Sequence, residues 1–480
     1  MKLKYLGNSK TSIFTDDQQE AINGILQFLA EDFKDGSFIV SLCGPGGVGK
    51  TFCIDYIIHN SVYTPSVIMC AAPTHKACRN LSNAIRGRKV ITIQSLFGFR
   101  LDCNIEDFDP NNPYFSPISN PKLTNLYKVL IIDESSMLNQ KLVNYIVNYC
   151  RKLKIKVIFV GDDFQLAAPK DNKISSFNKS SKIFKLNQIV RQSENNPIRD
   201  VLDIMRNDIE HKTFNFLNYV NKKKEDVNPL NNTGWHFIDM NTAANLIKFK
   251  FSGEEFQEDV GMYKIISYKN IRVTSWNNFV RKCIIPNSTK SILTKDDLLM
   301  SYSTIVDDFN SIVFANSEEY IVHDIVDTVD SIYNFKGFLV RFQQVYGGDI
   351  TPPIFVINHV DSYTWQYYCK VVSDMIDEAK RANDHSRSGL WKKYFEFKKR
   401  YLSLVPIIDI TGKIISDKDL DYGFAITSHK SQGSTYGTVF VDLKDMIYDR
   451  NNHPFTNRDD VLRRIYVACS RPAKELYLIW

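Results

Sequence analysis

Short runs of β-branched and other apolar residues recur along the chain, and each run ends in a polar or glycine-rich loop. Runs of this length are typical of buried strands. Helix-like stretches lie between several of them, and this alternation predicts parallel sheets covered by helices, with sites at the carboxyl ends of the strands. The six clearest runs are FIVSLC (38–43), SVIMC (66–70), KVLII (128–132), KVIFV (156–160), KIIS (264–267) and TVFVDL (438–443).

Two stretches interrupt this alternation. Residues 97–125 are rich in Pro, Asn and Asp, which predicts an excursion from the first sheet with an aromatic hairpin or loop tip. Residues 291–407 mix strand-like pieces with the helix-like run SGLWKKYFEFKKRYLSL and indicate a second insertion. Aromatic residues recur in that run at helical spacing, with the lysines between them, so a packed amphipathic helix is favoured over a nucleic-acid surface.

Composition narrows the class of protein. A chain of 480 residues is long enough for roughly two to four domains. No uninterrupted apolar run reaches the roughly 18 residues needed to cross a bilayer, and the N-terminus lacks the apolar core of a signal peptide, so we expect no membrane partner. The nine cysteines show no metal-binding spacing, and a net charge of +6 permits a polyanionic partner without requiring one.

The segment GPGGVGKT (44–51) carries the clearest chemistry in the sequence. It lies between a strand-like run and the helix-like run TFCIDYIIHN, as the GxxxxGK[ST] phosphate loop requires. Backbone N–H groups of such a loop converge on phosphates, Lys50 can reach the outer phosphates, and the Thr51 hydroxyl can hold Mg²⁺. The predicted nucleotide-binding residues here are Gly44, Pro45, Gly46, Gly47, Val48, Gly49, Lys50 and Thr51.

Polar residues follow two further strand-like runs. Asp133 and Glu134 come directly after 128–132, where Asp133 would hold Mg²⁺ and Glu134 would orient or deprotonate an attacking water. Alone, such acids could equally be helix caps, but the upstream phosphate loop favours the catalytic interpretation. Gln165 follows 156–160, where its amide can sense a γ-phosphate.

The loop AITSHKSQGST (425–435) allows two interpretations. Ser428, His429 and Ser431 would suit nucleophilic catalysis, whereas the lysine and the hydroxyls would suit phosphate contacts. The phosphate loop and the carboxylates already define a different chemistry, and no oriented partner is evident for the serine and histidine. A nucleophilic triad is therefore disfavoured.

Taken in order, these segments resemble the motifs of the superfamily 1 helicases, in the 5′ to 3′ branch that contains the phage Dda and bacterial RecD enzymes. DESSM and GDDFQL resemble motifs II and III, AITSHKSQG resembles motif V, and RRIYVACSRP resembles motif VI. Further segments resemble the Q motif, motif Ia, the motif Ib region, motif IV and the strand and helix that follow it: FTDDQQEA (14–21), APTHKA (72–77), TIQSLFG (92–98), LNQIVRQSENNPI (186–198) and ISYKNIRVTSWNNFVR (266–281).

The resemblance implies an α/β fold with two RecA-like, parallel-sheet motor domains of the P-loop NTPase class and a small insertion in each. It implies motor domain 1A at 1–96 and 126–190 and insertion 1B, with a wedge hairpin, at 97–125. Motor domain 2A would occupy 191–290 and 408–480, and a β-rich and helical insertion 2B would occupy 291–407.

The resemblance also implies ATP and Mg²⁺ as cofactors and ATP hydrolysis coupled to 5′ to 3′ movement on single-stranded DNA and to duplex unwinding. The expected partners are single-stranded DNA and duplex junctions, with replication, recombination or repair proteins as further candidates. A monomer in the cytoplasm is expected, or in the host cytoplasm if the chain is phage-encoded. Two alternatives stay open: a P-loop ATPase switch that binds nucleic acid or protein without unwinding, and an RNA helicase.

On the nucleotide side, the resemblance implies that Gln18 contacts adenine and that Arg191 and Arg471 point at the γ-phosphate. Gln432 and Gly433 would approach the nucleotide. Lys50, Glu134 and Gln165 complete the expected catalytic set with the two arginines.

On the nucleic-acid side, the implied contacts come from motifs Ia, Ib and V: Pro73, Thr74, His75, Lys76, Thr92, Ser95, Thr427, His429 and Lys430. Thr74 could instead simply cap a helix. Tyr114 and Phe115 are expected as a strand-separating wedge, and the alternative is that they pack inside the 1B core. The chain departs from the family pattern at QLAAP, where two alanines precede Pro169, and at Gln94, where the family usually has histidine.

Overall fold

The computed structural model describes most of the chain. The undescribed residues are 1–3, 8–9, 102, 104, 113–114, 169–170, 172–173, 189–195, 287, 308–310 and 410, and side chains are also left undescribed at 4–7, 10–13 and 384–385. Two compact units result. One comprises Met1–Ala243, Ile266–Lys269 and Thr427–Trp480, and the other Ala244–Ile265 and Asn270–Ile426.

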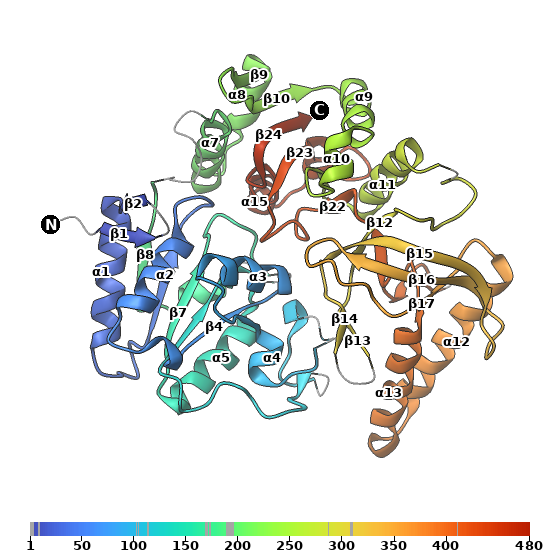
Figure 1. The fold of residues 1–480 in the computed structure, drawn as a ribbon, viewed down its shortest axis with the longest axis horizontal. Helices are drawn as coiled ribbons and strands as arrows, with labels where there is room; N and C mark the ends of the chain where they lie inside the picture. Colours follow the sequence, from blue (N-terminus) through green and yellow to red (C-terminus); the bar gives the residue numbers. More distant parts are fainter. Residues whose placement is uncertain are drawn as a thin grey trace. The chain divides into compact units, whose positions relative to one another are not determined.

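The first sheet has six strands in the order β5-β4-β6-β7-β3-β8, and all five neighbouring pairs are parallel. Strands β4, β7 and β8 of this sheet are labelled in Figure 1. Its strands are β3 (Ile39–Cys43), β4 (Ile68–Ala72), β5 (Ile91–Thr92), β6 (Val129–Ile132), β7 (Lys156–Gly161) and β8 (Lys182–Lys185). The four apolar runs predicted in this part of the chain are thus confirmed as strands of one parallel sheet.

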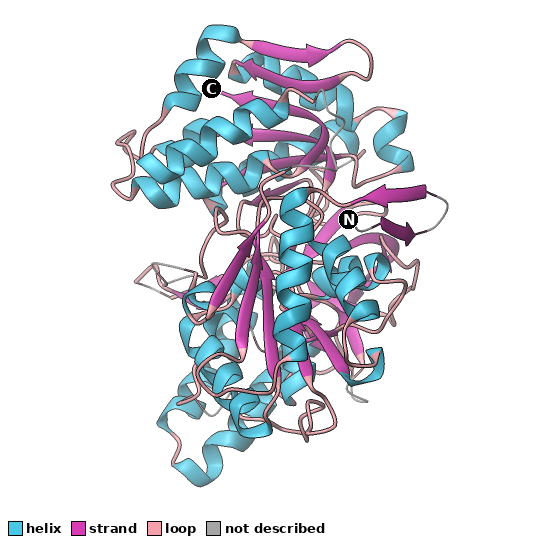
Figure 2. Cartoon of the chain, turned by 90° about the vertical axis from the view of Figure 1, so that its left-hand side faces the viewer, coloured by secondary structure: helices cyan, strands magenta, loops and turns pink. Residues whose placement is uncertain are grey.

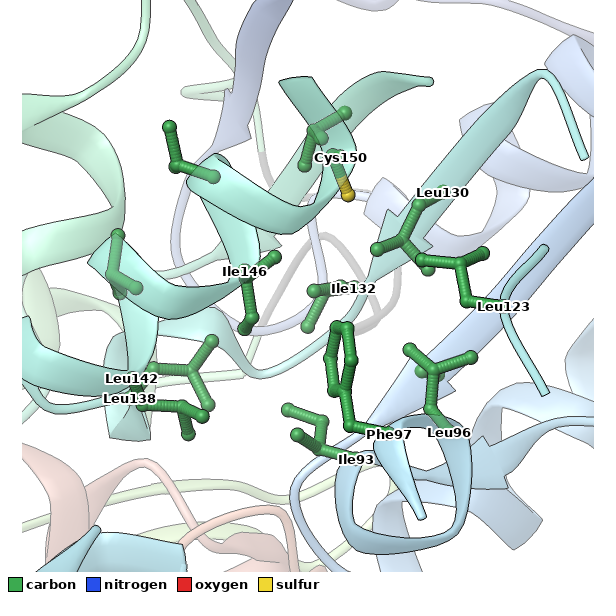
Figure 3. Close-up of a cluster of buried hydrophobic side chains, with 14 of the residues drawn as sticks. Ile93, Leu96, Phe97, Leu123, Leu130, Ile132, Leu138, Leu142, Ile146 and Cys150 are labelled. Carbon is green, nitrogen blue, oxygen red and sulfur yellow. The ribbon is translucent and has the colours of Figure 1, made fainter. Parts of the chain in front are cut away.

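Helices cover both faces of this sheet, and the alternation of strands and helices can be followed in Figure 2. One core cluster joins the sheet to α1 (Asp16–Ala30), α2 (Lys50–Asn60) and α3 (His75–Ala84). Another joins it to α4 (Ile93–Phe97) and α5 (Gln140–Leu153). In Figure 3 the labelled side chains of α4 and α5 point toward Leu130 and Ile132 of β6.

The second sheet has the order β22-β11-β23-β24-β10-β9, with β23, β24 and β10 parallel to one another. Its strands are β9 (Glu225–Asn228), β10 (Thr233–Ile238), β11 (Tyr263–Ser267), β22 (Ala425–Thr427), β23 (Tyr436–Asp442) and β24 (Pro472–Ile479). The helices in these segments are α7 (Ile198–His211), α8 (Asn215–Lys223), α9 (Met240–Phe251), α10 (Glu254–Glu258), α11 (Asn270–Ile284), α14 (Leu443–Ile447) and α15 (Arg458–Cys469). The predicted strands at 264–267 and 438–443 are β11 and β23.

The third sheet forms the second insertion and is mainly antiparallel, in the order β18-β17-β16-β15-β12-β21. Its strands are β12 (Leu298–Ser301), β15 (Glu319–Val329), β16 (Lys336–Gln344), β17 (Ile354–Ile357), β18 (Tyr401–Leu402) and β21 (Leu420–Tyr422). Because β21 pairs with β12, this sheet extends beyond residue 407, where the sequence analysis ended the insertion. The pairing joins segments far apart in the chain, which no local pattern reveals.

Two helices of the insertion, α12 (Ser362–Arg381) and α13 (Asp384–Arg400), pack against one another and the sheet through aromatic side chains. Tyr394 and Phe397 are buried, whereas Lys392 and Lys393 are exposed. The amphipathic-helix prediction for this run is confirmed. Among the described residues, no helix combines the length and apolarity needed to cross a membrane.

For the first insertion, the sequence predicts either an aromatic hairpin or a loop tip. The described residues of 97–125 contain no strand: after the end of α4 at Phe97 they form turns, bends and short 3₁₀ turns, among them η2 (Ile105–Asp107). The described part of the insertion is therefore a loop. The closely spaced Pro and Asn residues favour turns over a paired strand.

The shorter elements complete the fold. Two-stranded pairs are formed by β1 (Lys4–Gly7) with β2 (Lys10–Ile13), β13 (Ile305–Val306) with β14 (Ile312–Phe314), and β19 (Ile407–Ile408) with β20 (Ile414–Ser416). The remaining short helices are η1 (Pro65–Val67), η4 (Ser135–Met137) and α6 (Ser175–Asn178).

Candidate active site

The phosphate loop joins β3 to α2, as the sequence predicts. Gly47 and Gly49 have φ angles of 84° and 82°, a left-handed conformation that favours glycine. A Cβ at Gly49 would lie 2.6 Å from Gln18 Nε2, so a side chain there would also collide with α1. The loop therefore needs glycine for both conformation and space.

Lys50 opens α2 and extends over the loop. Its Nζ donates hydrogen bonds to the carbonyl oxygens of Gly44, at 2.6 Å, and Pro45, at 2.9 Å. Thr51 is the second residue of the same helix. A cation inside a glycine loop at a helix N-terminus is the donor set that a polyphosphate requires, so these residues fit ATP.

Gln18 supports this loop from α1. The side chain is 2% exposed, and its Nε2 donates to the carbonyl oxygen of Val48 at 2.8 Å. Its Oε1 accepts from the backbone N–H of Thr15 at 3.1 Å, which completes a capping box. The amide thus links the helix start to the phosphate loop, and its contact with adenine stays a prediction.

Asp133 and Glu134 lie at the carboxyl end of β6. Burial, and then the negative charge of Glu134, raise the pKa of Asp133 to about 7, although the nearby Lys50 opposes the rise. Glu134 has a φ of 50°, an uncommon conformation for a non-glycine residue and one found often at functional sites. Two carboxylates held together beside a lysine fit a divalent cation, whose charge would offset their repulsion.

Motif III follows β7 and includes a buried acid that the sequence analysis did not select. Asp162 is 1% exposed, and its Oδ2 accepts from Gln165 Nε2 at 3.4 Å and from the Tyr466 hydroxyl at 3.2 Å. Burial raises the pKa of Asp162, while the positive charges of Lys50 and Arg471 oppose the rise. Gln165 is itself 4% exposed.

Helix α15 meets motif III through a second side chain. Arg463 Nη1 donates to the carbonyl oxygens of Asp163, at 2.5 Å, and Gln165, at 3.2 Å. The sequence analysis matched this helix to motif VI but did not select Arg463 or Tyr466. Their partners lie 298 to 304 residues away in the chain, so no local signal could have identified the contacts.

Arg471 follows α15 and is 6% exposed. Its guanidinium donates to the carbonyl oxygens of Val467, at 2.9 Å, and Ser434, at 3.3 Å. Its positive charge also opposes the rise in the pKa of Asp162. Its contact with the γ-phosphate stays a prediction. The other predicted arginine, Arg191, lies outside the described residues.

The motif V loop makes two hydrogen bonds to segments around the first sheet and lies near a third segment. Gln432 Nε2 donates to the Leu166 carbonyl oxygen at 3.4 Å, and Asn80 Nδ2 donates to the Gly433 carbonyl oxygen at 3.0 Å. A Cβ at Gly433 would lie 3.9 Å from Glu134 Oε1. Gln432 and Gly433 are therefore adjacent to motif III, α3 and the motif II glutamate.

The remaining motif V residues surround the turn that follows β22. The Thr427 Oγ1 accepts from the Lys430 backbone N–H at 3.3 Å. Burial lowers the pKa of His429, with Arg464 acting in the same direction and Asp460 opposing it. The His429 imidazole is therefore neutral at pH 7.

The serines of this loop do not form a nucleophilic site. Ser428 is fully buried, and its Oγ has no hydrogen-bond partner among the residues that the structure describes. Ser431 Oγ donates to the Ser428 carbonyl oxygen at 2.7 Å. A serine nucleophile needs a base within hydrogen-bonding distance, so this geometry agrees with rejection of a triad.

Motifs Ia and Ib begin helices. Thr74 Oγ1 accepts from the Ala77 N–H at 3.2 Å and caps α3, and Thr92 caps α4 in the same way. The cap interpretation of Thr74 is thus confirmed, and its contact with nucleic acid stays a prediction. Ser95 Oγ accepts from Lys122 Nζ at 2.6 Å.

The other motif Ia residues precede or open α3. Pro73 is buried, and burial lowers the pKa of His75. Lys76 Nζ lies 5.2 Å from the centre of the Tyr436 ring, on β23. The contact between Lys76 and Tyr436 joins α3 to the second sheet.

Phe115 packs inside the first insertion. The side chain is 6% exposed, and its ring centre lies 5.4 Å from that of Phe108 within the α4–α5 core cluster. This burial favours the packing interpretation over a wedge for Phe115. Tyr114 lies outside the described residues.

Comparison with known proteins gives similarities at the level of sequence and of fold. Residues 14–222 match a family model described as an AAA domain. An uncharacterized protein of Acanthamoeba polyphaga mimivirus is 24% identical over 536 aligned residues, covering 97% of this chain and 99% of that protein. The solved structure of a Bacteroides Pif1 helicase in complex with ADP-AlF3 and single-stranded DNA is 17% identical, covers 97% of this chain and 92% of the other, and has a TM-score of 0.48.

The ATP-dependent DNA helicase dda of Enterobacteria phage T4 is 30% identical over 202 residues. The match covers 40% of this chain and 42% of the phage protein, so it spans less than half of either. It agrees with the motif order and with a phosphate loop, paired acids and a buried glutamine at the ends of parallel strands. In motif order and in these matches, the chain is similar to the superfamily 1 helicases of the 5′ to 3′ branch that contains the phage Dda enzyme.

Proposed function

We propose that this protein is an ATP-dependent DNA helicase that moves 5′ to 3′ on single-stranded DNA and separates duplex DNA. One observation supports the proposal most strongly. The motif V loop, which carries predicted strand contacts, also touches α3 through Asn80 and lies beside the motif II residue Glu134. A loop in this position links occupancy of the strand site to the geometry of ATP hydrolysis.

On the nucleotide side, Thr51 and Asp133 would hold Mg²⁺, which when bound neutralises negative charge on the outer phosphates. Lys50 contacts those phosphates from the glycine loop, and Glu134 accepts a proton from the attacking water. The amide of Gln165 orients that water.

Two arginines complete the proposed catalytic set. Arg471 and Arg191 neutralise charge that develops on the transferred phosphoryl group. In related enzymes one such arginine accelerates hydrolysis by about 10³- to 10⁵-fold.

On the strand side, hydroxyl, imidazole and ammonium groups contact the phosphate backbone: Thr74, His75, Lys76, Thr92, Ser95, Thr427, His429 and Lys430. Such contacts position a strand without reading its sequence. A motor that moves along any sequence needs this kind of contact.

Two alternatives make different predictions. An ATPase switch that binds a protein would not respond to nucleic acid, and an RNA helicase would respond to RNA. The relative dda is named as a DNA helicase, which favours DNA.

The test is steady-state ATP hydrolysis with single-stranded DNA, with RNA of the same sequence, and with neither. We expect DNA to raise kcat by about 5- to 150-fold, the usual range of coupling between sites. Lys50→Ala is the control for contaminating ATPase. Equal rates with and without nucleic acid would favour the switch, and stimulation by RNA alone would favour the RNA helicase.

A further inference from the structure

Gln165 has two unlike ends in this structure. Its Nε2 donates to Asp162 Oδ2 at 3.4 Å. Its Oε1 is buried and has no hydrogen-bond partner within the described part of the chain. The amide therefore presents one unused acceptor.

The direction of this amide follows from the chemistry of Asp162. An ionised carboxylate can only accept hydrogen bonds, so it attracts the NH₂ end of the glutamine and repels the oxygen end. With the NH₂ group held by Asp162, the oxygen is left to accept a hydrogen bond from water. If the amide were flipped, its NH₂ group would face the water instead of its oxygen. The water would then meet a hydrogen-bond donor and would be oriented differently.

Tyr466 holds the Asp162 carboxylate that orients the Gln165 amide. Its hydroxyl donates to the same Oδ2 of Asp162 at 3.2 Å, from helix α15. The side chain is fully buried, and its ring centre lies 6.0 Å from that of Phe164. Burial and the charge of Asp162 raise the pKa of Tyr466 well above its usual value, so the hydroxyl stays protonated and remains a donor.

The other oxygen of Asp162 is also occupied. Asp162 Oδ1 accepts from the backbone N–H of Phe164 at 2.9 Å. With one donor on Oδ1 and two on Oδ2, the carboxylate has a single orientation. Loss of the Tyr466 hydroxyl would leave the Oδ2 side to Gln165 alone.

We propose that Tyr466 is a positioning residue for ATP hydrolysis, which acts through Asp162 to set the orientation of the Gln165 amide. This inference rests on the proposed ATPase function and deepens it. Tyr466 lies on the motif VI helix α15, and Gln165 follows β7. Because both side chains bond Asp162, the orientation of the Gln165 amide depends on how α15 packs against motif III. Arg463 supports the same contact through the backbone of Gln165.

The first test replaces Tyr466 with phenylalanine, which removes the hydroxyl and keeps the ring. We expect kcat for ATP hydrolysis to fall by about 10- to 100-fold, the size expected for losing a hydrogen bond to a charged group. KM for ATP should stay within about twofold, since the contact does not hold the nucleotide. The control is Tyr149→Phe, which removes a hydroxyl that donates to the Leu123 carbonyl oxygen at 3.1 Å, away from the site.

The second test separates positioning from general loss of structure. In a Gln165→Ala background, Tyr466→Phe should produce no further loss of kcat, because the residue through which it acts is absent. Losses that multiply in the double variant would overturn the proposal, as would an unchanged kcat in Tyr466→Phe. A wild-type protein without ATPase activity would instead overturn the proposed function.

Discussion

His429 of motif V is proposed to contact the bound strand without taking part in acid-base chemistry. Burial and the nearby Arg464 lower the pKa of its imidazole, and Asp460 only partly opposes them. Because the pKa lies below its ordinary value of 6.5, the ring takes up a proton only at more acidic pH. Between pH 7 and 8.5 the ring is neutral, which suits a hydrogen-bonding contact.

The corresponding prediction concerns DNA coupling. His429→Ala should reduce the stimulation of ATPase by single-stranded DNA by about 2- to 10-fold, the effect of losing one hydrogen bond, and should affect the basal rate less. In the wild type the stimulation should not change between pH 7 and 8.5. A pH step near neutrality that disappears in the variant would show that a charged histidine matters.

For Phe115, the prediction concerns the stability of the protein instead of its coupling to DNA. Phe115→Ala should lower the free energy of unfolding by about 3 to 5 kcal/mol, because it leaves a cavity in a packed core. Denaturant unfolding measures this change, and unwinding should decline together with DNA-stimulated ATPase. Selective loss of unwinding at normal stability would restore the wedge interpretation.

At the scale of elements, the sequence predicts best where strand and helix patterns are strong. The run KVLII is continuous and apolar because β6 is buried on both faces of its sheet, and GPGGVGKT has a spacing that only a phosphate loop explains. Both predictions are confirmed in position. For 97–125 the sequence left a hairpin and a loop open, because Pro and Asn signal a turn but do not specify what flanks it, and the described residues there form a loop.

Pairings between distant segments could not be predicted. Leu420 of β21 pairs with Ser301 of β12, and Tyr466 bonds Asp162 across 304 residues. Such contacts depend on tertiary packing, and local periodicity predicts secondary structure only. The motif order therefore predicts which loops would carry the site, but it does not predict the side-chain contacts between these loops, such as the one between Tyr466 and Asp162.

Strands β11 and β15 are joined by an ion pair that gives an element-scale prediction. Lys264 Nζ contacts Glu319 Oε1 at 2.5 Å, and both side chains are at most 1% exposed. Glu319→Ala should cost about 3 to 5 kcal/mol of unfolding free energy, because it leaves a buried positive charge without its partner. Thermal or denaturant unfolding measures the loss.

The double variant Lys264→Met with Glu319→Leu is the matched control. Replacing a buried pair with apolar side chains is often neutral, so this variant should recover most of the stability lost in Glu319→Ala. If both variants are equally unstable, packing rather than charge determines the stability of this contact.

At the scale of the whole molecule, the proposed helicase activity requires coupling between the ATP site and a bound strand. The contacts that support it lie around motif V, where Asn80 and Gln432 bridge segments more than 250 residues apart in the sequence. Such bridges let a change at one site alter the other. The proposed direction of movement rests on the resemblance to the superfamily 1 helicases and not on any distance in this structure.

The most direct test of the proposed helicase activity is strand displacement with two substrates that share one duplex and carry either a 5′ or a 3′ single-stranded overhang. The protein should separate the 5′-overhang substrate in the presence of ATP and Mg²⁺, and Lys50→Ala should separate neither. Separation of only the 3′-overhang substrate would contradict the proposed polarity, and separation of neither by an active ATPase would contradict the proposed helicase activity.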